Sequence, residues 1–212
     1  MKHDNASIEK VYKTLHRALQ VAFKRDKVIR NVAALVDKPA APRRERIILR
    51  TDDEIRRFRQ AVKGSQYEVL YLTALDTGLR QGELLALKWE SMDLARRLIH
   101  VTATLTQNEA GESVPTPPKT LSSIRAVKLA KNTVEMLRDY RKRQMDPKRV
   151  PSVWVFPSRD GGPMRKDGYI KRELPRLLRK ANLPPISFHG LRHSHATLLG
   201  GRFKFRVNWV PA

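Results

Sequence analysis

The sequence contains no cysteine in its 212 residues, and this absence excludes several classes of protein at once. Disulfide-stabilised folds, cysteine-ligated zinc sites and thiol nucleophiles all require that residue. No run of apolar residues is long enough for a transmembrane helix, and the N-terminus lacks the apolar stretch of a secretory signal. We therefore expect no membrane partner.

Acidic residues are scarce relative to basic ones, because 21 Asp and Glu face 43 Lys and Arg. The resulting net charge of +22 favours a polyanionic partner. Nucleic acid is the preferred partner; an acidic membrane surface is the alternative, disfavoured because no stretch combines basic residues with a strongly apolar face. With 41% hydrophobic residues, the chain can still form a globular core.

The first forty residues predict two helical segments followed by a linker. Apolar residues recur at three- and four-residue steps over 7–25, after a capping Ser7, and a shorter apolar set covers 29–36. Two helices are too few for an independent core. Pro39 and Pro42, among basic residues, then indicate a linker.

The remainder predicts an α+β, mainly α fold with a small antiparallel sheet. A capping box at Thr51 and Glu54 starts a helix, and Gly78 ends the next one. Pro175 must lie at a helix boundary or kink. The strands are too few and too local for a doubly wound fold. The predicted segments are helices 66–76, 131–145, 168–182 and 189–199, a helix from residue 80, β-rich segments 98–105 and 124–129, a turn at 108–111 and an extended segment 153–156.

Segment 77–84, TGLRQGEL, is the first candidate for chemistry. Arg80 opens a helix, where the backbone N–H groups and the helix dipole favour anions. Glu83 lies three residues later on the same side of that helix. The alternative interpretation is an ordinary surface ion pair between these two residues.

Segment 188–196, FHGLRHSHA, is the second candidate. His189 and Arg192 are three residues apart, so an imidazole and a guanidinium can face one anion. His189 with His193 has a zinc-like spacing, but no glutamate base intervenes and a third ligand is hard to name. A solvated basic helix face is the other open interpretation.

Lys119, between two β segments, would by itself be an ordinary solvated lysine. Together with the two arginine motifs it suits a phosphodiester transition state, in which guanidiniums neutralise oxygens and a lysine protonates the leaving group. We find no pair of carboxylates suited to two metal ions, so a metal nuclease is disfavoured and no cofactor is expected.

The order of these motifs resembles the tyrosine recombinase (phage integrase) family over about residues 51–199. The resemblance implies that Arg80 and Arg192 clamp the scissile phosphate of double-stranded DNA, that Lys119 is the general acid, that His189 assists proton transfer and that Glu83 orients the arginine site. It also implies DNA integration or recombination with other recombinase protomers, in the cytoplasm and on the nucleoid of a bacterial or phage-derived system.

The same resemblance implies a division of the chain. Residues 1–41 would be a helical remnant of the domain that clasps DNA, 42–50 a linker, and 51–212 the catalytic domain without its C-terminal tyrosine segment. The family's Leu-Gly-His box and its tyrosine nucleophile have no match after Leu199. All five tyrosines precede His189: Tyr12, Tyr67, Tyr71, Tyr140 and Tyr169.

We therefore expect a truncated recombinase that is catalytically inactive alone. The alternative is a non-catalytic DNA-binding protein that competes with or modulates an intact recombinase.

Overall fold

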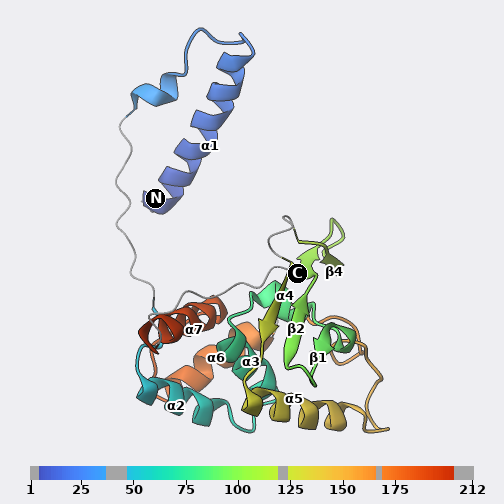
Figure 1. Ribbon diagram of the computed structural model, residues 1–212. Helices are drawn as coiled ribbons and strands as arrows, with labels where there is room; N and C mark the ends of the chain where they lie inside the picture. The colour runs from blue at the N-terminus through green and yellow to red at the C-terminus, as the bar shows by residue number, and fades with distance from the viewer. Residues whose placement is uncertain (1–4, 37–46, 119–123, 166–168, 203–212) are drawn as a thin grey trace. The chain divides into compact units, whose positions relative to one another are not determined.

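The computed structural model describes residues 5–36, 47–118, 124–165 and 169–202, and the chain divides into two compact units, 1–46 and 47–212 (Figure 1). Residues 47–50, which the sequence assigns to the linker, are part of the second unit. There the Leu49 side chain is fully buried, and its backbone N–H donates to Oγ of Ser194 at 2.9 Å.

The first unit consists of helix α1 (Asn5–Lys24) and the short 3-10 helix η1 (Val32–Leu35). Asn31 joins them, because its Oδ1 accepts from the N–H of Ala33 while its amide donates to the carbonyl of His16 at 3.0 Å. Ala33 is buried, yet Val11 and Leu15 on the apolar face of α1 are 67% and 52% exposed. The expectation of two helices without a full core agrees with this arrangement.

The second unit contains most of the helices. The predicted capping box is present at the start of α2, where Oγ1 of Thr51 accepts from the N–H of Glu54 and the Glu54 carboxylate accepts from the N–H of Thr51. The helices of this unit are α2 (Asp52–Val62), α3 (Glu68–Thr77), α4 (Gln81–Leu85), the 3-10 helix η2 (Trp89–Ser91), α5 (Lys131–Gln144), α6 (Tyr169–Lys180) and α7 (Phe188–Arg202).

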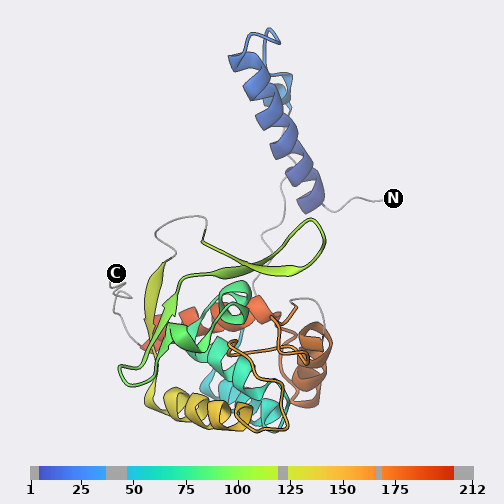
Figure 2. The ribbon, with the colours of Figure 1, turned by 90° about the vertical axis from the view of Figure 1, so that its right-hand side faces the viewer.

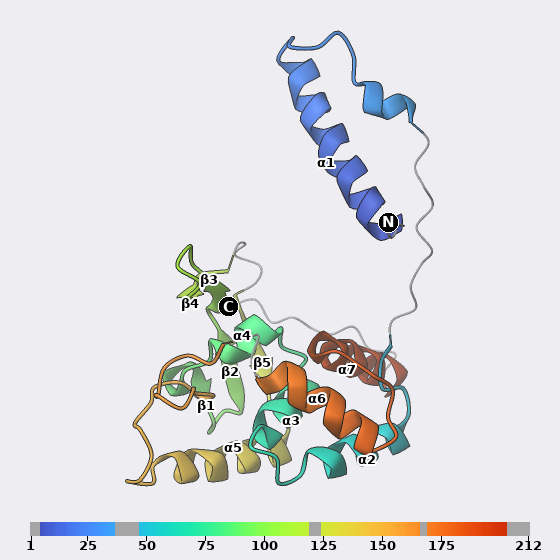
Figure 3. The same ribbon diagram turned by 180° about the vertical axis from the view of Figure 1, so that it is seen from behind.

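Helix α3 is central, with contacts to α2, α4, α5 and α7 (Figure 3). Most of its residues are buried, which agrees with a sequence that is apolar on every side. Each surrounding helix contributes buried side chains to one continuous core, among them Phe58, Leu84, Leu137 and Leu191. This packing fixes the C-terminal end of α3, from which the candidate site is built.

Two small antiparallel sheets lie beside the helices (Figure 2). The first has the order β1-β2-β5, with Ile99 of β2 opposite Val127 of β5. The second is the β3–β4 hairpin, in which Leu105 faces Pro115. The strands are β1 (Met92–Asp93), β2 (Leu98–Val101), β3 (Thr104–Gln107), β4 (Ser113–Thr116) and β5 (Arg125–Lys128).

The continuous β segment predicted over 98–105 is therefore wrong in detail, because the chain leaves one sheet after Val101 and enters the other at Thr104. Strand β4 was not predicted, since Pro115 cannot donate to a sheet ladder and argues against a strand. A two-stranded sheet consists of edge strands, where proline is tolerated. The turn predicted at 108–111 connects β3 to β4, where the N–H of Gly111 donates to the carbonyl of Asn108.

Two further predictions concern the segment 153–156 and the position of Pro175. The segment predicted as strand or extended, 153–156, has a single β-bridge between Trp154 and Lys88 and buries Val155 and Phe156. Pro175 lies inside α6 instead of at its boundary. Its side chain is exposed, so the ring does not disturb the buried face formed by Ile170, Leu174 and Leu178.

Candidate anion-binding site

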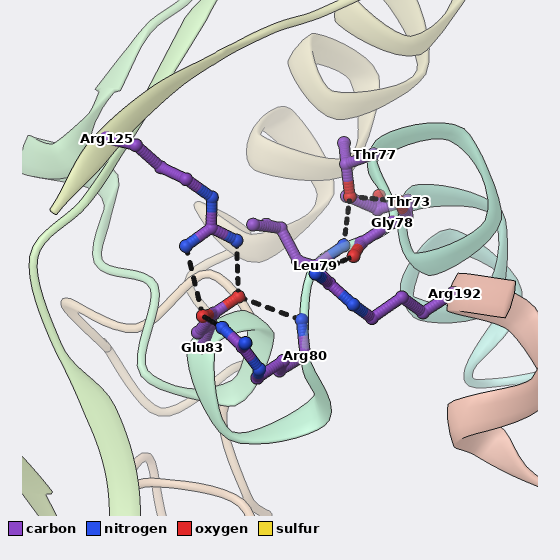
Figure 4. Close-up of polar contacts among 8 residues, drawn as sticks. All are labelled: Thr73, Thr77, Gly78, Leu79, Arg80, Glu83, Arg125 and Arg192. Atoms are coloured by element: carbon purple, nitrogen blue, oxygen red, sulfur yellow. Dashed lines mark hydrogen bonds and ion pairs between the residues drawn. The ribbon is translucent and has the colours of Figure 1, made fainter. Parts of the chain in front are cut away.

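The site begins at the tight turn between α3 and α4. Gly78 has a left-handed conformation with φ of 61°, and its N–H donates to the carbonyl of Ala74 at 3.0 Å. Oγ1 of Thr77 donates to the carbonyl of Thr73 at 2.6 Å and accepts from the N–H of Leu79 (Figure 4). This turn ends α3 and sets Arg80 as the residue immediately before α4, as the sequence predicts.

Arg80 and Glu83 form the predicted i,i+3 pair. Nη1 of Arg80 lies 2.8 Å from Oε1 of Glu83, and the backbone N–H of Arg80 donates to Oε2 at 2.9 Å. The two side chains differ sharply in exposure, at 56% for Arg80 and 5% for Glu83. The pair is therefore more than a surface ion pair, because its carboxylate is buried while its guanidinium reaches solvent.

A second arginine, Arg125 of β5, also contacts Glu83. Its Nη2 and Nη1 lie 2.7 and 3.1 Å from Oε2 and Oε1, so the carboxylate is held by a bidentate guanidinium (Figure 4). The Arg125 side chain is only 6% exposed. Arg125 was not predicted as a site residue, because a charged residue in an alternating strand is normally expected on the solvent face.

Glu83 is held as a carboxylate by these contacts. Burial alone would raise its pKa, but hydrogen bonds from the Arg125 side chain and from the backbone and side chain of Arg80 outweigh burial and hold the pKa at about 2. The result is a carboxylate that is charged at neutral pH and lies between an exposed and a buried guanidinium.

Arg192 of α7 extends toward the same turn. Its Nη1 donates to the carbonyl of Gly78, two residues before Arg80 (Figure 4). Burial lowers the pKa of Arg192, and the positive charges of Arg80 and Arg125 lower it further, while Glu83 opposes them. Arg80 and Arg192 therefore come together on one side of the turn, in a local field that favours an anion.

The histidines of α7 are arranged around this contact. His189 is exposed, and its ring meets that of His193 edge-on at a centroid distance of 4.5 Å. Nδ1–H of His195 donates to the carbonyl of Leu75 at 2.8 Å, near the end of α3. Over the residues that the structure describes, we find no group of three side chains able to hold a metal ion, so the zinc interpretation of His189 and His193 gains no third ligand.

Of the predicted site residues, the structure therefore brings Arg80, Glu83 and Arg192 together and puts His189 on the same helix as Arg192. Lys119 lies outside the described residues.

The comparison with protein families decides the identity of this arrangement. The model described as the phage integrase family matches residues 49–201. The chain belongs to the phage integrase family. The matched range includes the turn at Gly78, both Arg80 and Arg192, and the segment from His189 to Arg192.

Relatives of this integrase-family chain are tyrosine recombinases and integrases. It is 32% identical over 166 residues to a tyrosine recombinase XerC-like protein of Caldanaerobacter subterraneus subsp. tengcongensis, which covers 70% of this chain and 42% of the relative. It is 29% identical over 203 residues to the ICEBs1 integrase of Bacillus subtilis, with coverage of 92% and 54%. The chain thus spans about half the length of these relatives.

Solved structures support the fold. The Tn1549 transposon integrase in complex with a circular intermediate DNA has a TM-score of 0.80 and 22% identity, covering 93% of this chain and 67% of that one. A lambda integrase dimer bound to a core site has a TM-score of 0.63 and 20% identity, with coverage of 94% and 53%. The predicted tyrosine-recombinase-like, mainly α fold is confirmed, with two small antiparallel sheets where one was predicted.

The tyrosines of this integrase-family chain have packing roles where the structure describes their side chains in the second unit. The Tyr71 ring is fully buried against Tyr67 and Phe188, and burial together with the nearby Glu173 carboxylate raises the pKa of its hydroxyl. Tyr140 packs on Trp89 and Phe156. Such hydroxyls are poor nucleophiles, because a raised pKa keeps the hydroxyl protonated and packing in the core keeps the side chain from a substrate.

Proposed function

We propose that this chain binds double-stranded DNA and holds one phosphodiester between Arg80 and Arg192, as the phosphate-binding part of a site-specific tyrosine recombinase. The observation that carries the proposal is the approach of Arg192 from α7 to the Gly78 carbonyl, beside the exposed guanidinium of Arg80. Two guanidiniums suit the non-bridging oxygens of a phosphodiester in both charge and hydrogen-bond geometry.

The remaining residues have roles around that phosphate. Glu83 orients Arg80, Lys119 gives a proton to the leaving 5′ oxygen, and His189 assists proton transfer. In the covalent step, a tyrosine oxygen bonds to phosphorus as the bond to the 5′ oxygen breaks. No metal ion or cofactor takes part in this scheme.

Family membership and the net charge of +22 support DNA as the partner. The Tn1549 and lambda integrases of the solved structures are bound to DNA, and the lambda protein is a dimer. By analogy, residues 1–41 contribute a helical DNA-clasping part and 51–212 the catalytic domain. The proposed linker shortens to 42–46, because residues 47–50 belong to the second unit. Further recombinase protomers are partners. The setting is the bacterial cytoplasm, at the nucleoid. Among the residues that the structure describes, we find no helix long and apolar enough to cross a membrane.

The 212-residue chain by itself is proposed to bind without cleaving. Arginine clamps lower the barrier to phosphoryl transfer, but they cannot replace an attacking oxygen. Tyr71 and Tyr140 have the packing contacts of core residues, which supports this view. The second candidate function is a non-catalytic DNA-binding protein that competes with or modulates an intact recombinase. The packing of Tyr71 and Tyr140 in the core favours this function as well.

A covalent-trapping assay tests the proposal. A duplex is first selected from a random pool by this chain and is then nicked beside successive phosphates, so that a cleaved strand cannot be religated. The chain alone is expected to give complexes that dissolve in high salt, with no detergent-resistant adduct. A labelled adduct would contradict the inactive assignment, and mapping its tyrosine would identify the nucleophile.

Adding an intact recombinase separates the two candidate functions. An adduct that requires the added protein, and that disappears when its nucleophilic tyrosine is changed to phenylalanine, would mean that this pocket accepts a nucleophile from another protomer. Loss of the intact protein's own activity as this chain is added would instead support the competing role.

A further inference from the structure

Glu83 lies between two arginines that come from different parts of the second unit. Arg80 precedes α4, whereas Arg125 belongs to β5 and lies 42 residues after Glu83 in the chain. Arg125 contacts both carboxylate oxygens and is 6% exposed, while Arg80 uses Nη1 alone and is 56% exposed. The division is unequal: the buried guanidinium takes the bidentate position and the exposed one takes a single contact.

This division matters because a carboxylate and a guanidinium satisfy each other best as a bidentate pair. If Arg125 were absent, the open lone pairs of Glu83 would draw the guanidinium of Arg80 into that geometry. An arginine paired in this way is neutralised by its partner and has fewer N–H groups directed outward. The two arginines with one carboxylate instead retain one net positive charge.

We propose that Arg125 is a positioning residue that occupies Glu83 and thereby keeps the guanidinium of Arg80 available to a DNA phosphate. This inference rests on the proposed function, in which Arg80 contacts that phosphate. Arg125 itself is too buried to reach DNA, so its proposed effect on phosphate binding passes through its contact with Glu83.

The position of Arg125 adds a second consequence. It is the first residue of β5 and lies six residues after Lys119 in the sequence. The hydrogen bonds from Arg125 to Glu83 therefore hold β5 against the turn that carries Arg80.

Arginine side-chain NMR on the full chain tests the inference with inorganic phosphate as the probe. Two quantities are measured for Arg80: the shift of its Nε–H signal as phosphate is added, and the rate of rotation of its guanidinium. The variants are Arg125→Met, the double variant Glu83→Gln with Arg125→Met, and Arg125→Lys. The matched control is Arg59→Met, which removes another partly buried ion pair, to Asp76, in the same unit.

In the wild type, the Arg80 signal should shift to saturation. Arg125→Met should weaken the apparent phosphate affinity at Arg80 by about tenfold, the effect of losing one charge-assisted contact. It should also slow rotation of the Arg80 guanidinium, because Glu83 now holds it at two points. The double variant should recover phosphate affinity to within about twofold of wild type, since the glutamine amide oxygen can still accept from Arg80 and orient it, while no carboxylate competes for its charge. Arg59→Met should change neither quantity.

A purely structural role for Arg125 predicts a different result. Arg125→Met and the double variant would then be equally impaired, with the rotation of Arg80 unchanged, and this would overturn the inference. If Arg125→Met does not fold, the same two quantities are read from the double variant and from Arg125→Lys. The double variant leaves no uncompensated buried charge. Arg125→Lys retains the positive charge but lacks the bidentate guanidinium.

The readouts also separate this inference from the function on which it rests. A wild-type Arg80 signal that ignores phosphate would count against the proposed phosphate site. Rotation of the Arg80 guanidinium in Arg125→Met would still decide the role of Arg125: slower rotation supports it, and unchanged rotation contradicts it.

Discussion

Gly78 is the residue on which the geometry of the turn depends most directly. Its φ of 61° is a conformation that costs a residue with a side chain free energy, and an added methyl group would lie 2.5 Å from Cδ2 of His195. The His195 ring and the Arg192 guanidinium both bond to carbonyls at this end of α3. The turn, His195 and Arg192 are therefore one packed unit.

Changing Gly78 to Ala should lower the free energy of unfolding by about 3 kcal/mol, from left-handed backbone strain together with overpacking. Gly64 is the matched control, because its φ is 77° and an added methyl group would find open space. Gly64→Ala should cost only about 1 kcal/mol. Urea denaturation of both variants measures the difference, and equal losses would mean that the contact with His195 is unimportant.

Glu83 should make stability depend on acid pH. Its folded pKa of about 2 lies below the ordinary value of 4.5, so the unfolded chain binds the proton more tightly. The stabilisation is complete above about pH 5, disappears as the pH falls toward 2, and amounts to about 3 kcal/mol.

Urea midpoints measured from pH 7 to pH 3 check this expectation. Glu83→Gln should be less stable than wild type at pH 7 and should depend less on pH below 5. Glu135→Gln, at an exposed carboxylate of α5, is the control and should retain the wild-type dependence. A Glu83→Gln profile parallel to wild type would contradict the assigned pKa.

At the scale of elements, α6 contains a proline that lowers the stability of the helix. Pro175 lacks a backbone N–H in the middle of a twelve-residue helix, and its side chain is exposed. Pro175→Ala should therefore raise the free energy of unfolding by about 2 kcal/mol, since the helix regains a hydrogen bond and a better helix former. Arg176→Ala on the same exposed face should change it by less than about 0.5 kcal/mol. A calorimetric melt in which Pro175→Ala is unchanged or less stable would refute the argument.

The elements also show what local patterns can and cannot predict. The helices follow from their 3.6-residue period and their end signals, as the capping box at Thr51 and the glycine after α3 illustrate. The division of 98–105 between two sheets and the strand containing Pro115 depend on which segments pair, which no local pattern contains. Arg125 is the corresponding case within the site, because its burial results from a partner 42 residues away.

For the molecule as a whole, the net charge of +22 and family membership both support DNA as the proposed partner. The motifs at 77–84 and 188–196 were sufficient to predict the family and the meeting of Arg80 with Arg192, since each motif has a defined position on its helix. The roles of His189 and Lys119 in proton transfer stay predictions. A complex with six phosphate contacts should weaken with salt at a log–log slope of roughly −5.

The most direct test of the central claim, that Arg80 and Arg192 hold a DNA phosphate, is the salt dependence of DNA binding by two double variants. Arg80→Ala with Arg192→Ala should reduce the slope by about two, because two arginine contacts to DNA are lost. Lys131→Ala with Lys142→Ala removes the same charge from exposed positions on α5, on the side of the second unit away from α4 (Figure 1), and should leave the slope unchanged. Circular dichroism melts establish that both variants are folded. Equal slopes for the two double variants would contradict the account.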